Sequence, residues 1–296
     1  MIRKDVTETI VVAGANGDLG GRIVRAGLAR GAVVRALVRP GGDAAALAAA
    51  GAEVVAVDYS DAAALVRACR DARCVVSALN GLGETILDTQ TRLLDAAIGG
   101  GAARFVPSDF SIDYTALPTG TNRNFDLRRA FRTRLDTAPI LATSIFNGAF
   151  ADMLNGQMPL IQRPVRRVLY WGDADTRFAL TTKDDVAAYT AAAALDTAAP
   201  RDLHIAGASV SARDLAGVMG EVTGKRYGVL RAGSLNGLAR LIGATRRLFP
   251  DRTSVFPAWQ GMQYLHNMFD GRAPSAPTDN ARYDVAWTDL HDVLRG

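Results

Sequence analysis

The chain has 296 residues, of which 49% are hydrophobic and 22% charged, a composition that excludes a disordered protein and allows one large domain or two smaller ones. Its 34 Lys and Arg residues outnumber 30 Asp and Glu residues and give a formal net charge of +4, but they are interspersed along the chain, so we expect no nucleic-acid partner. The two cysteines and three histidines lack the spacing of a metal site or a catalytic triad, so we expect no metal. No apolar run is long enough to cross a bilayer and no signal sequence precedes the first expected strand, which predicts a cytoplasmic protein without a membrane partner.

Short β-branched segments alternate with longer helical segments from residue 9 to about residue 150. The expected strands are TIVVAG (9–14), VVRALVR (33–39), EVVAVD (53–58), CVVSAL (74–79), RFVPSD (104–109) and ILATSIF (140–146). The alanine-rich or amphipathic segments between them are long enough for the crossover helices that join parallel strands. This order predicts an α/β fold with a doubly wound parallel-sheet Rossmann domain over residues 1–155, whose ligands bind at the carboxyl ends of the strands.

The pattern changes in residues 156–296. A loop-rich stretch (156–175) precedes a helix whose start is marked by Thr182, and a strand (202–207) and a helix from Ser211 follow. Two helices are expected at about 234–249 and 257–269, then a proline-bearing loop (272–278) and a short final helix. We predict a smaller C-terminal substrate or cap region, of which residues 180–208 return to the Rossmann sheet.

The stretch VVAGANGDLGG (11–21) carries three glycines spaced three apart, between the first expected strand and the first expected helix. Gly14 can form the tight turn, Gly17 can let the backbone approach a pyrophosphate, and Gly20 can permit close packing of the helix on the strand. The helix start would supply backbone amides and a partial positive charge. We therefore predict a dinucleotide site that also includes Asn16, Asp18 and Leu19; a tight turn without a ligand is the alternative.

The end of the second expected strand distinguishes the two nicotinamide dinucleotides. A site for NAD(H) places Asp or Glu there, whereas this sequence places Arg39 in LVRP, which can pair with a 2′-phosphate. The sequence therefore favours NADP(H). Arg22 and Arg35 are further candidates for this contact or are solvated residues, and Asp58 is expected either to meet the adenine amino group or to form a turn.

These motifs resemble the NmrA-like, isoflavone reductase-like branch of the atypical short-chain dehydrogenases/reductases. The resemblance rests on GANGDLG, LVRP, RFVPSDFS (104–111), the arginine pair in NFDLRRAF, TTKDDVAAYT (181–190) and the final YDVAWTDLHDVL. It implies a Rossmann domain with a smaller substrate domain and, in the reductases, hydride transfer from NADPH to small aromatic molecules such as phenylpropanoid dimers. It also implies that Phe146, Asn147 and Gly148 lie along the nicotinamide, unless they simply form the turn by which the strand leaves the core. The ends of the fourth and fifth strands add further expected cofactor contacts, at Leu79, Asn80, Gly81, Pro107 and Ser108, although Ser108 and Asp109 could equally cap a helix or turn.

The catalytic residues depart from the family's pattern. None of the seven tyrosines has lysine four residues later, which argues against an epimerase or an ordinary carbonyl reductase. Isoflavone-type reductases carry a lysine shortly before the arginine pair, and the matching position here is Asn124, which can orient a water or a carbonyl but does not titrate. Water is then one proton source, and the other candidates are Asp109, Asp113 and Tyr114, while Lys183 is expected to act in a loop or cap. Trp259, Tyr264 and Phe269 either line a pocket for a flat substrate or belong to the core.

Two functions follow from these residues. The first is an NADPH-dependent reductase that acts on a small aromatic or unsaturated carbonyl-type molecule without the Tyr/Lys dyad. The alternative is a non-enzymatic NAD(P)-sensing regulatory protein of the NmrA type that acts through a protein partner. Either function is compatible with a homodimer.

Overall fold

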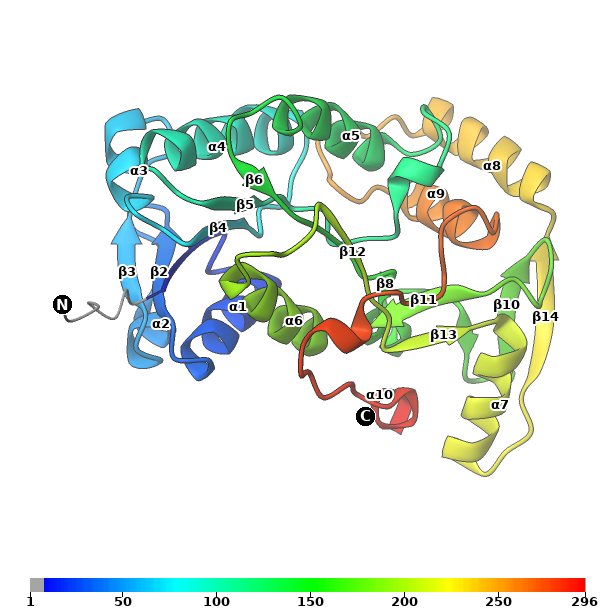
Figure 1. The fold of residues 1–296 in the computed structure, drawn as a ribbon. Coiled ribbons are helices and arrows are strands. Elements are labelled where there is room, and N and C mark those ends of the chain that lie inside the picture. The colour runs from blue at the N-terminus through cyan, green and yellow to red at the C-terminus, as the bar shows by residue number, and fades with distance from the viewer. Residues whose placement is uncertain (1–7, 296) are drawn as a thin grey trace. The chain divides into compact units, whose positions relative to one another are not determined.

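A six-stranded parallel sheet is the main feature of the fold (Figure 1). The computed structural model describes residues 8–295. The strands follow the spatial order β3-β2-β1-β4-β5-β6 and are β1 (Thr9–Ala13), β2 (Val33–Val38), β3 (Glu53–Ala56), β4 (Cys74–Ser77), β5 (Arg104–Val106) and β6 (Leu141–Ala142). Every neighbouring pair is parallel, and this is the strand order of the Rossmann fold. The predicted doubly wound α/β fold is therefore confirmed.

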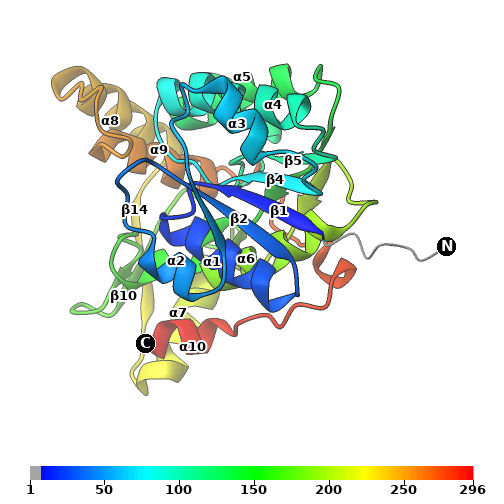
Figure 2. The same cartoon turned by 90° about the vertical axis from the view of Figure 1, so that its left-hand side faces the viewer.

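Helices cover both faces of this sheet, with α3, α4 and α5 on one face and α1, α2 and α6 on the other (Figures 1 and 2). Their bounds are α1 (Asp18–Ala29), α2 (Ala45–Ala49), α3 (Ala62–Ala68), α4 (Gln90–Gly99), α5 (Arg123–Leu135) and α6 (Lys183–Leu195), and the π-helical segment η1 (Glu84–Thr89) leads into α4. Apolar strand residues such as Val11, Leu37 and Phe105 pack with Leu93 and Phe131 in one buried core. Burying each such side chain contributes about 1.5–3 kcal/mol, which explains why the β-branched runs form the sheet.

The sixth expected strand is interrupted, so that part of the prediction was wrong. ILATSIF forms β6 and then β7 (Ser144–Phe146), which leaves the six-stranded sheet and pairs with β12 (Asp202–His204). Thr143 stands at the break: its hydroxyl donates to the Pro200 carbonyl and accepts from Arg104, at 2.7 Å in each case. The Thr143 N–H still donates to the Phe105 carbonyl at 3.0 Å, whereas the Ser144 N–H donates to the Arg201 carbonyl at 2.8 Å, so the backbone changes its pairing partner between these two residues.

The described chain divides into two compact units built from alternating segments. The first unit comprises the described residues up to Asp109, Leu127–Ile145 and Val186–Leu203, and the second comprises Phe110–Asp126, Phe146–Asp185 and the described residues from His204 onward. Residues 186–203, which hold most of α6, thus belong to the unit of the Rossmann sheet. The division into domains at residue 155 stays a prediction.

The second unit contains two small sheets and several helices. One sheet has the order β14-β10-β9 and the other β13-β11-β8, with β8 (Ala149–Phe150), β9 (Ile161–Gln162), β10 (Arg167–Trp171), β11 (Phe178–Thr181), β13 (Ala208–Val210) and β14 (Gly228–Gly233). The helices are α7 (Ala212–Thr223), α8 (Leu235–Leu248), α9 (Ala258–Phe269) and α10 (Leu290–Arg295), with short 3-10 turns η2 (Tyr114–Ala116), η3 (Ala151–Asn155) and η4 (Asn280–Arg282). The sequence predicted α7, α8 and α9 but not the short strands within 149–181, 208–210 and 228–233.

No helix within residues 8–295 combines the length and the apolar character that crossing a membrane requires.

Candidate functional site

The glycine loop joins β1 to α1, and two of its positions exclude any other residue. Gly14 has a φ of +76°, and a Cβ there would lie 2.8 Å from the Ala78 carbonyl oxygen. A Cβ on Gly20 would lie 2.8 Å from the Gly14 carbonyl carbon and would overlap its oxygen. Gly17 donates its N–H to the Gly14 carbonyl at 2.9 Å and precedes α1 without a side-chain cap. The helix therefore begins with backbone amides that no side chain caps, and such amides suit an anionic group.

Arg39 lies one residue beyond β2, in a turn closed by a 2.9 Å hydrogen bond from the Gly42 N–H to the Arg39 carbonyl. Its side chain is exposed, and the residues of the described chain give its guanidinium no hydrogen bond or ion pair. A Cβ on Gly42 would lie 3.2 Å from Asn16 Nδ2, so the Arg39 turn borders the glycine loop. Sequence reasoning missed Gly42, although the glycine pair after LVRP indicates such a turn.

The two other candidate arginines are already engaged. Arg22 pairs with Asp18 at 2.8 Å, one helical turn away in α1. Arg35 donates to the Arg70 carbonyl at 2.7 Å and pairs with Glu53 at 3.3 Å. Arg39 is therefore the arginine of the three whose guanidinium is available to a ligand.

Asp58 and Tyr59 follow β3. The Asp58 carboxylate accepts a 2.8 Å hydrogen bond from the Ser60 N–H, which lowers the pKa of Asp58 and shows that it closes a turn. Burial raises the pKa of Tyr59 to about 12, while the Gly14 backbone and the Arg39 charge act in the opposite direction. Tyr59, which the sequence did not single out, thus lies close to both the glycine loop and Arg39.

Two buried hydroxyl groups stand at the carboxyl ends of neighbouring strands. Ser77 ends β4 and Ser108 follows β5, and within residues 8–295 neither hydroxyl has a hydrogen-bond partner. After β4, Leu79 is half-buried and Asn80 exposed, and a Cβ on Gly81 would overlap the Thr85 side chain. A buried hydroxyl without a partner costs roughly 1–3 kcal/mol, so Ser77 and Ser108 are candidates for ligand contacts.

Side chains fix the backbone of Ser108. The buried Gln90 at the start of α4 accepts from the Ser108 N–H at 3.0 Å, and Arg128 of α5 donates to the Ser108 carbonyl at 2.8 Å. Pro107, just before it, is buried. One arginine of the predicted pair therefore braces the turn after β5, and Gln90 is a second brace that the sequence did not reveal.

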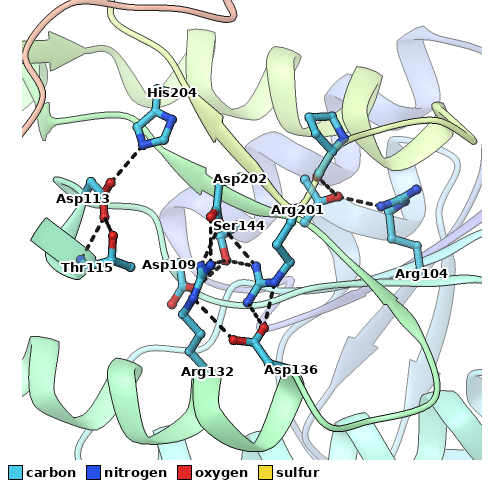
Figure 3. Close-up of polar contacts among 12 residues, drawn as sticks. Arg104, Asp109, Asp113, Thr115, Arg132, Asp136, Ser144, Arg201, Asp202 and His204 are labelled. Carbon is cyan, nitrogen blue, oxygen red and sulfur yellow. Dashed lines mark hydrogen bonds and ion pairs between the residues drawn. The ribbon is translucent and has the colours of Figure 1, made fainter.

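Asp109 belongs to a network of charged groups in the first unit (Figure 3). Its buried carboxylate accepts from the Ser144 hydroxyl at 2.7 Å, and that hydroxyl accepts from Arg201 at 2.7 Å. Arg132 of α5 makes a two-bond pair with Asp202 of β12, at 2.7 and 2.8 Å. The network ties α5 to β7 and β12, which is a structural role.

In the second unit, the chain after β7 is closely packed. The Asn147 N–H donates to the Ser111 carbonyl at 3.0 Å, and the Thr181 hydroxyl donates to the Asn147 carbonyl at 2.7 Å. Gly148 has a φ of +70°, and a Cβ there would overlap the Ala179 carbonyl. Phe146 is buried. The predicted cofactor residues at this turn are thus held rigidly.

Asp113 and Tyr114 occupy buried positions near Phe146. Asp113 accepts from the Thr115 N–H at 2.8 Å and contacts His204 Nε2 at 3.0 Å (Figure 3). Burial raises the pKa of Asp113, but its hydrogen bonds to His204 and Thr115 outweigh that effect and leave the pKa below its ordinary value. The fully buried Tyr114 ring packs against Phe146 with centroids 5.6 Å apart. Both candidates therefore lie inside the fold.

Asn124 lies in the first turn of α5 and is 1% exposed. Its Nδ2 donates to the Val255 carbonyl and to the Tyr264 hydroxyl, at 3.2 Å in each case, and its Oδ1 accepts from Arg123 Nε at 3.2 Å. Asn124 is therefore a fixed amide whose donor reaches the phenol of α9.

The three aromatic residues of α9 differ in position. Trp259 and Phe269 are 3% and 1% exposed and belong to the interior, whereas Tyr264 is half-buried.

Lys183 stands at the start of α6, where its N–H donates to Asp152 at 2.9 Å. In the described part of the chain, no three His, Cys, Asp or Glu residues are grouped so that they could hold a metal ion. Cys69 and Cys74 are free thiols, and burial raises the pKa of each to about 12.

Known proteins with similar sequences and structures include several reductases. The chain is 33% identical over 214 residues to pinoresinol reductase 1 of Arabidopsis thaliana, a match that spans 66% of each chain, just under two thirds. It is 29% identical over 177 residues to an NmrA-like family domain-containing oxidoreductase of Gibberella moniliformis, covering 56% of each. The crystal structure of isoflavone reductase superposes with a TM-score of 0.80 at 21% identity, covering 97% of this chain and 98% of that one. The leucoanthocyanidin reductase–NADPH complex of Vitis vinifera has a TM-score of 0.78 at 18% identity, covering 96% and 97%.

The family assignment rests on the extent of the sequence match. The NmrA-like family model matches residues 6–244, well over half of the chain, and that range includes the glycine loop, Arg39, the PSDF segment and the arginine pair. The chain belongs to the NmrA-like family.

Proposed function

We propose that the chain is an NADPH-dependent reductase that transfers hydride to a small aromatic or unsaturated carbonyl-type substrate. The observation that carries this proposal is the glycine loop with the unpaired guanidinium of Arg39 beside it. Such a site combines backbone amides for a pyrophosphate with a cation for a 2′-phosphate. The similarity to pinoresinol reductases supports the same activity and an aromatic substrate class.

The residues of the first unit fit this cofactor. A Cβ added to Gly17, the residue that precedes α1, would have only the Gly14 carbonyl oxygen within 4 Å, at 3.2 Å, so a large side chain there would occupy the space beside the loop that a pyrophosphate needs. The buried hydroxyls of Ser77 and Ser108 provide hydrogen-bonding groups at the carboxyl edge of the sheet, where ligands of this fold bind. The cofactor supplies the hydride, and the protein contributes binding, orientation and exclusion of water.

NADPH oxidation with a substrate panel tests the proposal. The panel contains pinoresinol-type lignans, isoflavones and aromatic unsaturated carbonyl compounds, and we expect at least one to accelerate oxidation above the uncatalysed rate. Gly17→Trp should abolish this turnover because the indole fills the space beside the glycine loop. Gly217→Trp is the matched control, since Gly217 is exposed on α7 with no heavy atom within 4 Å of an added Cβ. Absence of turnover across the panel would refute the reductase.

One observation favours a second function, a sensor of nicotinamide dinucleotides that acts through a protein partner. Asn124 is buried, bonded through both its amide nitrogen and its oxygen, and cannot exchange a proton. A sensor would capture a partner in pull-down experiments only in the presence of one dinucleotide. Stereospecific transfer of the hydride to a substrate would rule this function out.

A further inference from the structure

Helix α8 and the loop that follows it expose a group of large apolar side chains within the second unit. They are Leu241, Leu248, Phe249 and Phe256, with exposed fractions between 53% and 70%. Single exposed apolar residues are ordinary on a protein surface, whereas several of them close together mark an interaction site. The segment 235–256 is therefore a candidate docking surface.

The exposed leucines of α8 form a strip that the fold does not use. Helix α8 lies beside α9 (Figures 1 and 2), and its buried residues Leu238 and Ile242 pack in the core of the second unit. Leu241 and Leu248 are seven residues apart, which places them two helical turns apart on one face. Helix α8 thus carries a second apolar strip in addition to the one that it buries.

Basic side chains accompany this strip. The segment holds four arginines, Arg240, Arg246, Arg247 and Arg252. Arg240 and Arg247 directly precede the two exposed leucines, so an Arg-Leu pair repeats after two helical turns. Within residues 8–295, the guanidinium groups of Arg240, Arg247 and Arg252 form no hydrogen bond or ion pair. Unpaired cations beside exposed apolar side chains favour a partner that is both apolar and negatively charged.

The one acidic residue of the segment, Asp251, is used by its own turn. Its carboxylate accepts from the Thr253 N–H at 3.0 Å and from the Ser254 N–H at 2.9 Å, and these hydrogen bonds hold the pKa of Asp251 well below its ordinary value. Helix α8 itself has no carboxylate. Two copies of the chain that met through α8 would bring arginines together without compensation, which disfavours a second copy as the partner.

An anionic lipid surface satisfies both requirements. A helix that lies in the membrane interface buries its apolar side chains at the boundary of headgroups and acyl chains, while its arginines stay among the headgroups. Lipids rearrange around leucine and phenylalanine side chains, so this partner needs no preformed pocket. An acidic protein would have to present a surface shaped to fit the same side chains.

We propose that residues 235–256 are a peripheral docking surface for membranes that contain anionic lipids. Leu241, Leu248 and Phe249 enter the boundary of headgroups and acyl chains, and Arg240 and Arg247 contact lipid phosphates. This function is additional to the proposed reductase and does not depend on it. It departs from the expectation of no membrane partner, which rested on the lack of an apolar run able to span a bilayer, because a helix on the surface needs no such run.

Flotation with lipid vesicles tests the basic half of this surface. The full chain should float with vesicles of phosphatidylglycerol and phosphatidylcholine but not with phosphatidylcholine alone, and less so at high salt. Each arginine near an anionic membrane strengthens binding about 5-fold, so Arg240→Gln combined with Arg247→Gln should weaken it about 25-fold. Arg67→Gln with Arg226→Gln is the matched control, since it removes two exposed charges elsewhere. Wild-type binding by the first pair, or no binding by the unmodified chain, would overturn the proposal.

A fluorescent label tests insertion of the apolar half. The natural thiols of Cys69 and Cys74 are buried, so an environment-sensitive dye attaches to Leu248→Cys or, as a control, to Val165→Cys, a position that is also exposed. Emission from position 248 should shift to the blue with anionic vesicles, and emission from position 165 should not. An unchanged emission at 248, or binding to polyglutamate without binding to vesicles, would show that lipid is not the partner. Wild-type thermal unfolding of each variant would show that weaker binding does not come from unfolding.

Discussion

Replacing Arg39 should separate the affinities for the two reduced dinucleotides. The guanidinium is exposed and has no partner in the described chain, so Arg39→Ala leaves no charge unpaired and costs the fold little. A hydrogen bond to a charged group contributes about 1.5–3 kcal/mol, and exposure to solvent places this contact at the lower end of that range. A loss of about 1.5 kcal/mol corresponds to a roughly 10-fold rise in Kd. NADPH should therefore bind about 10-fold more weakly, and NADH as before.

Calorimetric titration with NADPH, NADP⁺, NADH and NAD⁺ on the same preparation measures this difference. Arg22→Ala is the matched control, because Arg22 is already paired with Asp18 and its loss should leave the preference for NADPH intact. The wild-type preference should also shrink as ionic strength rises, since salt screens an exposed charge pair. Equal weakening of NADPH and NADH in Arg39→Ala, or an unchanged preference, would show that Arg39 does not contact the 2′-phosphate.

Three further predictions concern stability. Gly148→Ala should lower the free energy of unfolding by about 2–4 kcal/mol in urea titrations, because φ is +70° and the new Cβ overlaps the Ala179 carbonyl; wild-type stability would contradict this. Arg132→Ala should cost about 2 kcal/mol by the same assay, since it leaves the partly buried carboxylate of Asp202 without its two-bond partner, and a cost near zero would argue against the network. Hydrogen bonds to two carboxylates raise the pKa of His291 above its ordinary value of 6.5, so their stabilisation is complete below pH 6.5 and is lost as the pH rises through the raised value. The stability difference between wild type and His291→Gln should therefore shrink with rising pH, and a constant difference would refute the pairing.

The sequence predicted the Rossmann sheet well because its signals are local. Strands β1 to β4 each contain consecutive β-branched residues, and Gly14 and Gly20 are only six residues apart, so both features can be found in a short window. The break after Thr143 was not predictable, since the backbone there changes its partner from Phe105 to Arg201, and both residues are distant in the sequence. The short strands of the second unit were missed because segments of two to six residues show no clear alternation.

The sequence by itself determined the fold class and the glycine loop, and it placed at position 39 an arginine, which favours a 2′-phosphate. Residues that are neighbours along the chain produce all three features. Tertiary structure decided which arginine is available, since Arg35 is engaged by the Arg70 carbonyl, 35 residues away. It also joined Asn124 to Tyr264 across 140 residues. Side chains that distant meet only when helices pack, and periodicity within one helix carries no information about which partner it will meet.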